Sequence, residues 1–326
     1  MINTILCLLL FCVHVVLVFA SSLQSDWINH GGDLFNRRYA YNEHKINPET
    51  VSNLSLKWKF NAGKDITATP TIYNGTIYFP CWNGNIYAIK QIDGSLVWKQ
   101  NLEELTGLNA TGIIKAVNWS VARATPTVAE DLLIVGIYGP AVVIGLERRT
   151  GELIWLTHLD NHPAGVITMS GTYYNGLEAG PSGAAGGGIF GASTDEKRVY
   201  TNIANSDAKN FKLLPTNMNT TSGGWVGMDA MNGEIIWTTA NPSNNSANGP
   251  VSVANEVVFA GSMDRLGHIY ALNAKNGKIV WSYETGANVY GGMSISDGCI
   301  YVGHGYNVSL GYPRRIGGTS LFAFCV

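Results

Sequence analysis

Two charged side chains stand at positions where their chemistry could serve a binding or catalytic site. Asp207 lies in the stretch ANSDAKN beside Asn205, and a carboxylate there can accept a proton or, with the amide, bind a cation. The alternative is that the aspartate closes an asparagine-rich turn. Arg123 directly precedes ATPTV. Buried in a channel, its guanidinium would suit an anionic group, the alternative being a structural ion pair or carbonyl clamp.

An apolar leader and glycosylation sequons suggest the secretory pathway. From Ile5 to Phe19 the chain is almost wholly apolar, and Val18 and Ala20 form a small-residue cleavage pattern, so residues 1–20 read as a secretory signal peptide and residues 21–326 as the mature, secreted protein. Seven sequons are expected to carry N-glycans, at Asn53, Asn74, Asn109, Asn118, Asn219, Asn244 and Asn307. Three cysteines remain after the leader, too few for a disulfide scaffold.

Composition excludes two classes of partner. The formal net charge is −2 and 13% of residues are charged, which argues against a basic nucleic-acid surface or a polybasic membrane patch. No segment after the leader is long and apolar enough to cross a bilayer. The 38 glycines, 9 tryptophans and 15 tyrosines favour short strands joined by glycine turns, an all-β fold.

A repeated unit must position any such site. Four stretches end alike on tryptophan: AIKQIDGSLVW, GLERRTGELIW, GMDAMNGEIIW and ALNAKNGKIVW. A further hairpin precedes these stretches, as in ATPTIYNGTIYF. One more hairpin, GGMSISDGCIYVG, follows the last of them. Two hairpins make a four-stranded antiparallel sheet, and tandem sheets with a periodic aromatic predict a β-propeller. Loops between the second and third strands, and loops leading into each first strand, should share one face.

These loops predict which polar residues rim that face: Asn83, Asn205, Asp207, Asp264 and His304, with Asp65, Asp160 and Glu284 nearby.

The ends and the middle of the chain break the repeat. The last unit lacks its tryptophan strand, and LSLKWKF, ending at Phe60, is a tryptophan strand without a unit. We expect the two to join and close the propeller. Cys299 and Cys325 then fall on adjacent strands at bridging distance, which predicts a disulfide between them and a free Cys81.

Residues 168–188 start like a repeat unit, but the rest of that unit does not follow. TMSGTYYNG aligns with TATPTIYNG at 67–75, but a glycine-rich run follows instead of a second strand. The chain therefore holds about five blades and one orphan strand, whose backbone has no partner in its own blade. We interpret 168–188 as a deletion junction, from splicing or a gene-model join.

The repeat resembles the pyrroloquinoline-quinone (PQQ) propeller repeat. DWINHGGDLFNRRYAYNEHKINPETVSNLSLKWKF is similar to the opening of quinoprotein alcohol dehydrogenases, and DITATPTIYNGTIYFPCWNGNIYAI with ANSDAKN resembles the polyvinyl-alcohol-dehydrogenase-like branch. Its members are expected to have eight blades, so the resemblance implies roughly three lost blades.

The resemblance also implies a function and its residues. PQQ would accept hydride from a small or polymeric alcohol, with calcium polarising the quinone and a carboxylate acting as base. Asp207 is the candidate base, Asn205 and Asp207 the candidate calcium ligands, and Arg123, Phe190 and Asn205 the candidate quinone contacts. The chain has no adjacent cysteine pair, and Phe190 stands where relatives often have tryptophan; an impaired enzyme is expected. The alternative is a non-catalytic secreted propeller that binds a glycan or protein partner.

Overall fold

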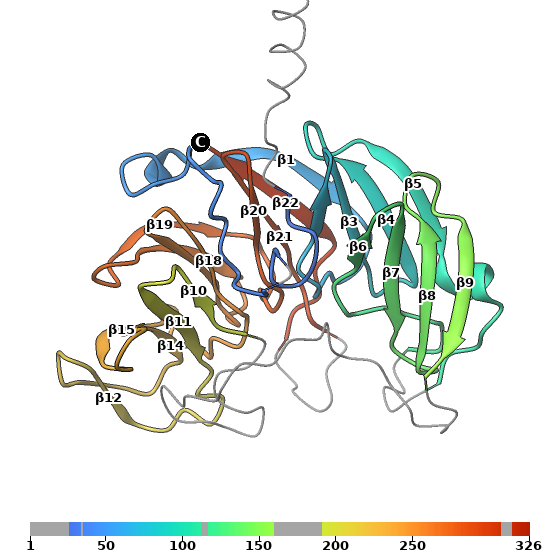
Figure 1. Ribbon diagram of the computed structural model, residues 1–326. Coiled ribbons are helices and arrows are strands. Elements are labelled where there is room, and N and C mark those ends of the chain that lie inside the picture. Colours follow the sequence, from blue (N-terminus) through green and yellow to red (C-terminus); the bar gives the residue numbers. More distant parts are fainter. Residues whose placement is uncertain (1–25, 34, 112–116, 160–190, 308–314) are drawn as a thin grey trace, which may run out of the picture.

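The computed structural model describes residues 26–33, 35–111, 117–159, 191–307 and 315–326 (Figure 1). The segment 1–20, the orphan strand and junction at 168–188, Asp160 and Phe190 lie outside these residues. Within them the chain forms five four-stranded antiparallel sheets, the blades of a propeller, as the repeat predicts.

Each blade follows the chain from its inner to its outer strand, and the strands are as follows. Blade 1 contains β2 (Thr71–Tyr73), β3 (Thr76–Pro80), β4 (Asn85–Lys90) and β5 (Leu96–Asn101). Blade 2 contains β6 (Thr127–Ala129), β7 (Leu132–Ile137), β8 (Val142–Glu147) and β9 (Leu153–His158). Blade 3 contains β10 (Ser193–Thr194), β11 (Arg198–Ile203), β14 (Gly224–Asp229) and β15 (Ile235–Ala240). Blade 4 contains β16 (Ser252–Ala254), β17 (Val257–Gly261), β18 (His268–Asn273) and β19 (Ile279–Glu284).

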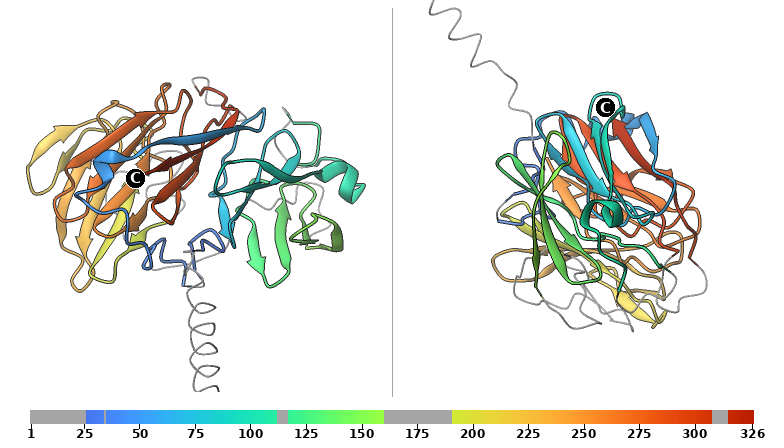
Figure 2. Two further views of the ribbon diagram at one scale, coloured as in Figure 1. Left: turned by 90° about the horizontal axis from the view of Figure 1, so that it is seen from above. Right: turned by 90° about the vertical axis from the view of Figure 1, so that its right-hand side faces the viewer.

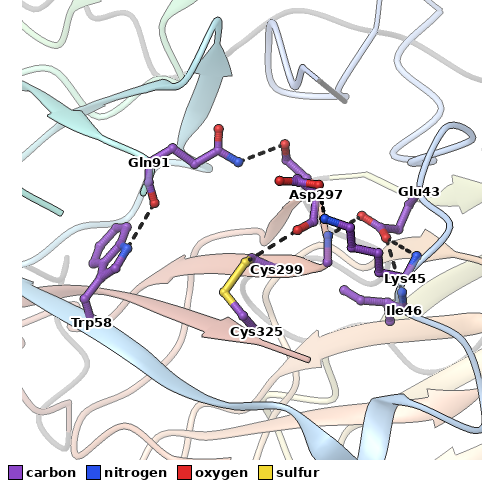
Figure 3. Close-up of a disulfide and its surroundings, with 10 residues drawn as sticks. Glu43, Lys45, Ile46, Trp58, Gln91, Asp297, Cys299 and Cys325 are labelled. Atoms are coloured by element: carbon purple, nitrogen blue, oxygen red, sulfur yellow. Dashed lines mark hydrogen bonds and ion pairs between the residues drawn. A yellow bond between two sulfur atoms is a disulfide. The ribbon is translucent and has the colours of Figure 1, made fainter. Parts of the chain in front are cut away.

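Blade 5 is assembled from both ends of the described chain. It contains β20 (Ser294–Ser296), β21 (Cys299–Gly303), β22 (Ser320–Cys325) and, as its outer strand, β1 (Ser55–Asn61). β1 pairs antiparallel with β22, which confirms that the N-terminal tryptophan strand completes the last unit. Cys299 and Cys325 are register partners and form a disulfide (Figure 3), whereas Cys81 is a buried free thiol.

Three short elements lie outside the blades. They are the 3₁₀ turn η1 (Val51–Asn53), the helix α2 (Leu102–Thr106) and the hairpin β12 (Phe211–Leu213) with β13 (Met218–Thr220), which is inserted in blade 3.

A small residue on the third strand receives the tryptophan of each blade. Trp98 faces Ala88 and Trp155 faces Gly145, and the register slips by one residue just beyond each pair. A Cβ on Gly145 would approach the Trp155 ring to 2.3 Å, so the indole lies flat on the strand. The bulge and the small residue together turn the tryptophan toward the neighbouring blade.

The tryptophans dock neighbouring blades together. The indole N–H of Trp58 donates to the carbonyl of Gln91 in blade 1 at 3.0 Å (Figure 3), and Trp98 donates to Arg148 in blade 2 at 3.0 Å. Trp237 of blade 3 donates to Ala274 of blade 4 at 2.9 Å. In each case the acceptor lies three residues before the turn glycine.

Blade 4 docks on blade 5 in a modified form. The outer strand of blade 5 comes from the N-terminal part of the chain, so this blade has no outer turn. Trp281 instead donates to the carbonyl of Leu54, just before β1, at 3.0 Å. The same kind of contact therefore joins four pairs of blades.

The five blades form an arc. Inner strands contact one another in the order β6, β2, β20, β16, β10, so blades 2 and 3 are its two ends, on the right and lower left of Figure 1 and in separate groups in Figure 2. Among the described elements, no comparable contact joins β6 to β10. The pairing of β1 with β22 thus completes blade 5, while among the described elements the ring stays open between blades 2 and 3.

Residues 26–47, which we call the strap, connect the inner strands. Trp27 exchanges two 2.8 Å backbone hydrogen bonds with Ile72 of blade 1, and the carbonyl of Ile28 accepts from Val128 of blade 2. Farther along the strap, carbonyls accept from Thr194 of blade 3 and Val253 of blade 4. The Glu43 carboxylate accepts from the Gly298 N–H of blade 5 at 2.8 Å. The strap thus reaches all five blades, including both ends of the arc.

Candidate functional site

Loops of one class bring six side chains together, which we call the aromatic–arginine cluster. Loops between second and third strands supply Trp82, Tyr138, Tyr306 and Arg315, and loops leading into first strands supply Arg123 and Tyr290. These are the loops that the sequence predicts to share the rim. They come from blades 1, 2 and 5, which are consecutive in the arc.

The rings of the cluster pack around Tyr306. The Trp82 centroid lies 6.3 Å from that of Tyr306 and 6.2 Å from that of Tyr138, and the Tyr290 ring stacks on Tyr306 with centroids 4.3 Å apart. Trp82, Tyr138 and Tyr306 are buried. Aromatic surfaces with such contacts form a rigid wall because each ring is held by its neighbours.

Two guanidinium groups lie over these rings. Arg123 Cζ is 5.9 Å from the Trp82 centroid and 5.7 Å from that of Tyr306, and Arg315 Cζ is 4.8 Å from that of Tyr306. All three distances are within the range of cation–π attraction. Arg123 therefore lies among aromatic rings with a second arginine nearby. Its role as a channel-facing cation stays a prediction.

Burial raises the pKa of two tyrosines of the cluster, Tyr290 and Tyr138. Burial raises the pKa of Tyr290 to about 12, an effect that Tyr306 adds to and Arg123 and Arg315 oppose. Burial also raises the pKa of Tyr138; Arg123 opposes this shift and Tyr306 adds to it. Among the described residues, the charged groups that act on these two phenols are arginines, and such a setting suits a planar anionic ligand.

Hydrogen bonds from neighbouring residues fix the cluster. The Trp82 indole donates to Thr67 Oγ1 at 2.9 Å, and the Trp119 indole donates to the Trp82 carbonyl at 2.9 Å. Asp65 holds the β21–β22 loop, since its carboxylate accepts the N–H of Asn307 at 2.7 Å and of Gly318 at 2.6 Å. Burial nevertheless raises the Asp65 pKa, with these two bonds acting in the opposite direction.

Asn205 and Asp207 lie apart from this set of contacts. The Asn205 amide donates to the carbonyls of Lys209, Thr221 and Ser222, and its oxygen accepts the Lys209 N–H. Its hydrogen-bonding groups therefore close the loop. Asp207 is exposed, with its carboxylate 3.9 Å from the Lys209 ammonium. Phe190 is outside the described residues.

The other predicted rim residues form hydrogen bonds or ion pairs with nearby groups of the protein. Asn83 donates to the Ala62 carbonyl and to the Tyr87 hydroxyl. Asp264 accepts from the N–H groups of Leu266 and Gly267, and His268 lies 3.0 Å from its carboxylate and 3.2 Å from that of Glu284.

His304 is a buried, neutral imidazole. Its Nε2 accepts the Thr319 N–H at 3.0 Å, and burial lowers its pKa to about 4, with nearby Lys59 adding to the shift.

Calcium does not fit the described residues. No three His, Cys, Asp or Glu side chains gather in the described ranges as a metal site would require. The amide oxygen of Asn205 is already engaged and the Asp207 carboxylate points to solvent and Lys209. Calcium prefers six to eight oxygen ligands, more than these residues offer.

Sequence reasoning missed most of the cluster. It named Arg123 but not the aromatic residues or Arg315, although a signal was present: Trp82, Tyr138 and Tyr306 each follow the second strand of their blade within three residues. Aligning the loops that follow the second strand of each blade, as well as the strands, would reveal these residues.

All seven sequon asparagines are exposed, at Asn53, Asn74, Asn109, Asn118, Asn219, Asn244 and Asn307. Within the described ranges, no helix is long and apolar enough to cross a membrane.

Comparisons with known proteins support the fold and the repeat. Residues 51–174 and 222–317 match the PQQ_2 family, described as "Outer membrane protein assembly factor BamB". Polyvinylalcohol dehydrogenase of a Pseudomonas species is 26% identical over 218 residues, 67% of this chain and 29% of that protein. Quinohemoprotein alcohol dehydrogenase ADH-IIG of Pseudomonas putida is 23% identical over 82% of this chain and 39% of its own length.

A solved structure agrees at the level of fold. The quinohemoprotein alcohol dehydrogenase of Comamonas testosteroni superposes with a TM-score of 0.51 and 13% identity, covering 92% of this chain and 80% of that chain. The chain spans well under half the length of the two dehydrogenases that it matches in sequence.

Proposed function

The chain belongs to the PQQ_2 family and fits the superfamily of PQQ-dependent alcohol dehydrogenases, and from this premise we propose that it is a secreted quinoprotein-type propeller that retains part of a quinone site and has impaired turnover. The observation that carries the proposal is the aromatic–arginine cluster. It offers stacked rings and two guanidinium groups, the chemistry that a planar, carboxylated quinone requires.

The residues of the cluster divide the work of binding. Arg123 and Arg315 would pair with the ligand's carboxylates, because a guanidinium presents donors in a fixed plane that matches a carboxylate. Trp82, Tyr290 and Tyr306 would supply apolar surface and exclude water. When bound, the quinone would supply the acceptor for hydride from an alcohol.

Impaired turnover is proposed because the described residues of the cluster include no base. The Asp65 carboxylate holds the β21–β22 loop, and both of its oxygens accept hydrogen bonds from backbone N–H groups. Asp207 is exposed and paired with Lys209. A carboxylate that removes the alcohol proton must lie within hydrogen-bond reach of the substrate, and a substrate at the cluster has no such group among the described residues.

Secretion and glycosylation belong to the same proposal. The leader pattern at residues 1–20 and the exposure of all seven sequon asparagines support passage through the secretory pathway, where glycans are added to exposed sites. The gap in the family match between residues 174 and 222 supports a junction near 168–188.

A binding propeller is the second candidate function. The matching family bears the description of an assembly factor. A cluster with arginines and tyrosines but no free carboxylate among the described residues also suits recognition of an anionic group on a protein or glycan partner. This candidate predicts ligand binding with no oxidation of any alcohol.

One titration tests the proposal. PQQ, with and without calcium, is added to the secreted protein while tryptophan fluorescence and quinone absorbance are followed, and dye-coupled alcohol oxidation is assayed on the same samples. We expect saturable quenching that weakens at least tenfold in Arg123→Ala and Arg315→Ala, with little or no oxidation. Arg149→Ala is the matched control, since that arginine is 74% exposed and pairs with Asp131.

Two outcomes would contradict the proposal. Quenching that is unchanged in both cluster variants would remove the quinone site from the cluster. Full alcohol dehydrogenase turnover by the 326-residue chain would show that a base is present and that the shortened propeller is a working enzyme.

A further inference from the structure

The contact between blades is repeated closely enough to define what each blade presents to the next. Turn glycines Gly94, Gly151 and Gly277 all have positive φ, and a Cβ on each would approach the tryptophan ring of the preceding blade to 2.8, 2.8 and 2.5 Å. The indole therefore covers the glycine while its N–H bonds to the carbonyl three residues earlier. One blade gives a tryptophan, and its neighbour gives a glycine turn.

Both halves of one such contact are left without a partner among the described residues. Trp155 of blade 2 occupies the position of the docking tryptophans, yet its indole N–H makes no hydrogen bond within the described part of the chain. Gly233 of blade 3, with φ +76, is the equivalent turn glycine, and no described atom lies within 4 Å of the position of its Cβ. Ala230, three residues earlier, is exposed. These two halves lie at the two ends of the arc.

We propose that the ends of the arc bind a second copy of this chain, head to tail, with Trp155 of one copy docked on the Ala230–Gly233 turn of the other. Each copy carries one tryptophan half and one glycine half, so another copy always supplies the complement that either end requires. The contact continues an interface that the chain already makes within itself between blades 1 and 2 and between blades 3 and 4. Because the two surfaces differ, the contact is heterologous, and copies can add to both ends.

The physical cause is the exposure of complementary apolar surface. An indole face and a flat glycine turn lose water when they meet, and the indole N–H gains the carbonyl that its counterparts already have. Met231 lies in the same turn as Gly233 but is not expected to take part in the contact with the indole. It is 92% exposed, and its equivalent in blade 1, Ile92, is still 70% exposed although that turn is docked.

Two variants, each of which removes one half of the contact, test the proposal. Trp155→Ala removes the tryptophan half. Gly233→Asn keeps a residue that tolerates positive φ and places a side chain where the indole would lie. Met231→Ser is the matched control in the same turn. Masses are measured by sedimentation equilibrium and by light scattering after size exclusion, with far-ultraviolet circular dichroism to verify folding.

We expect the wild-type chain and Met231→Ser to form dimers or longer head-to-tail chains, and each of the other two variants to be monomeric. An equimolar mixture of Trp155→Ala and Gly233→Asn should regain dimers, up to twice the monomer mass, because each retains the half that the other lacks. A monomeric wild-type chain at about 100 µM would overturn the proposal. So would association of either single variant to the wild-type extent, or a mixture that remains monomeric, since non-specific aggregation needs no complementary pair.

Discussion

Replacing turn glycines by alanine measures which blade contacts are made. Gly94, Gly151 and Gly233 have φ values of +70, +77 and +76, so alanine pays nearly the same backbone penalty at each, about 1–2 kcal/mol. The new methyl group would then meet the Trp58 or Trp98 ring at 2.8 Å in the first two cases and no described atom in the third. Overpacking of this kind costs about 1–3 kcal/mol more.

The expected order of stability follows directly. Gly94→Ala and Gly151→Ala should lose about 2–5 kcal/mol of unfolding free energy and Gly233→Ala about 1–2 kcal/mol. The assay is urea unfolding followed by circular dichroism, at a protein concentration at which the chain is monomeric. Equal losses at all three positions would refute the open arc, because they would mean that Gly233 is covered by an indole as the others are.

Three further predictions concern pH, the disulfide and secretion. Burial lowers the pKa of His304 from 6.5 to about 4, so the unfolded chain takes up a proton first and stability falls as pH decreases from about 6.5 to 4, by about 3 kcal/mol; melting temperatures of wild type and His304→Gln between pH 7 and 4 should diverge, and parallel curves would contradict this. Reducing the Cys299–Cys325 disulfide, which closes a separation of 26 residues, should cost about 3.5 kcal/mol on the chain-entropy estimate, and an unchanged urea midpoint in the Cys299→Ser, Cys325→Ser double variant would argue against it. Secreted protein should begin near Ser21 and lose mass on enzymatic deglycosylation, whereas an intact Met1 or an unchanged mass would count against the secretory interpretation.

Much of the fold could be predicted because its signals are local. Each hairpin has its own glycine turn, and the tryptophan recurs at the same place in every outer strand, so blade number and strand order follow from the repeat. The pairing of β1 with β22 could also be predicted, because two incomplete units at opposite ends of the sequence complete each other.

The strap could not be predicted in the same way. Trp27, Ile28 and Arg38 contact the inner strands through backbone N–H and C=O groups, which every residue carries, so these contacts leave no side-chain pattern in the sequence. The turn-closing role of Asn205 could not be predicted for a related reason. An amide that binds a ligand and an amide that closes a turn use the same atoms, and only the distances to Lys209 and Ser222 reveal which partners it has.

The position of the break explains why binding and turnover can separate in this chain. The aromatic–arginine cluster is built from blades 5, 1 and 2, and these three are docked to one another through Trp58 and Trp98. The break between blades 2 and 3 therefore leaves the contacts within the cluster intact. A central ligand in a propeller, however, is enclosed by loops from around the whole ring, so we propose that the side of the site beyond blade 2 comes from additional blades in a longer form. Ring stacking and guanidinium pairing need only the blades that are present, whereas proton removal needs a carboxylate that the described loops do not provide.

A longer form of the chain, with blades inserted between Trp155 and Gly233, would occupy both open halves of the docking contact and enclose the cluster at the same time. Such a form should be monomeric where the 326-residue chain associates, and should bind quinone more tightly.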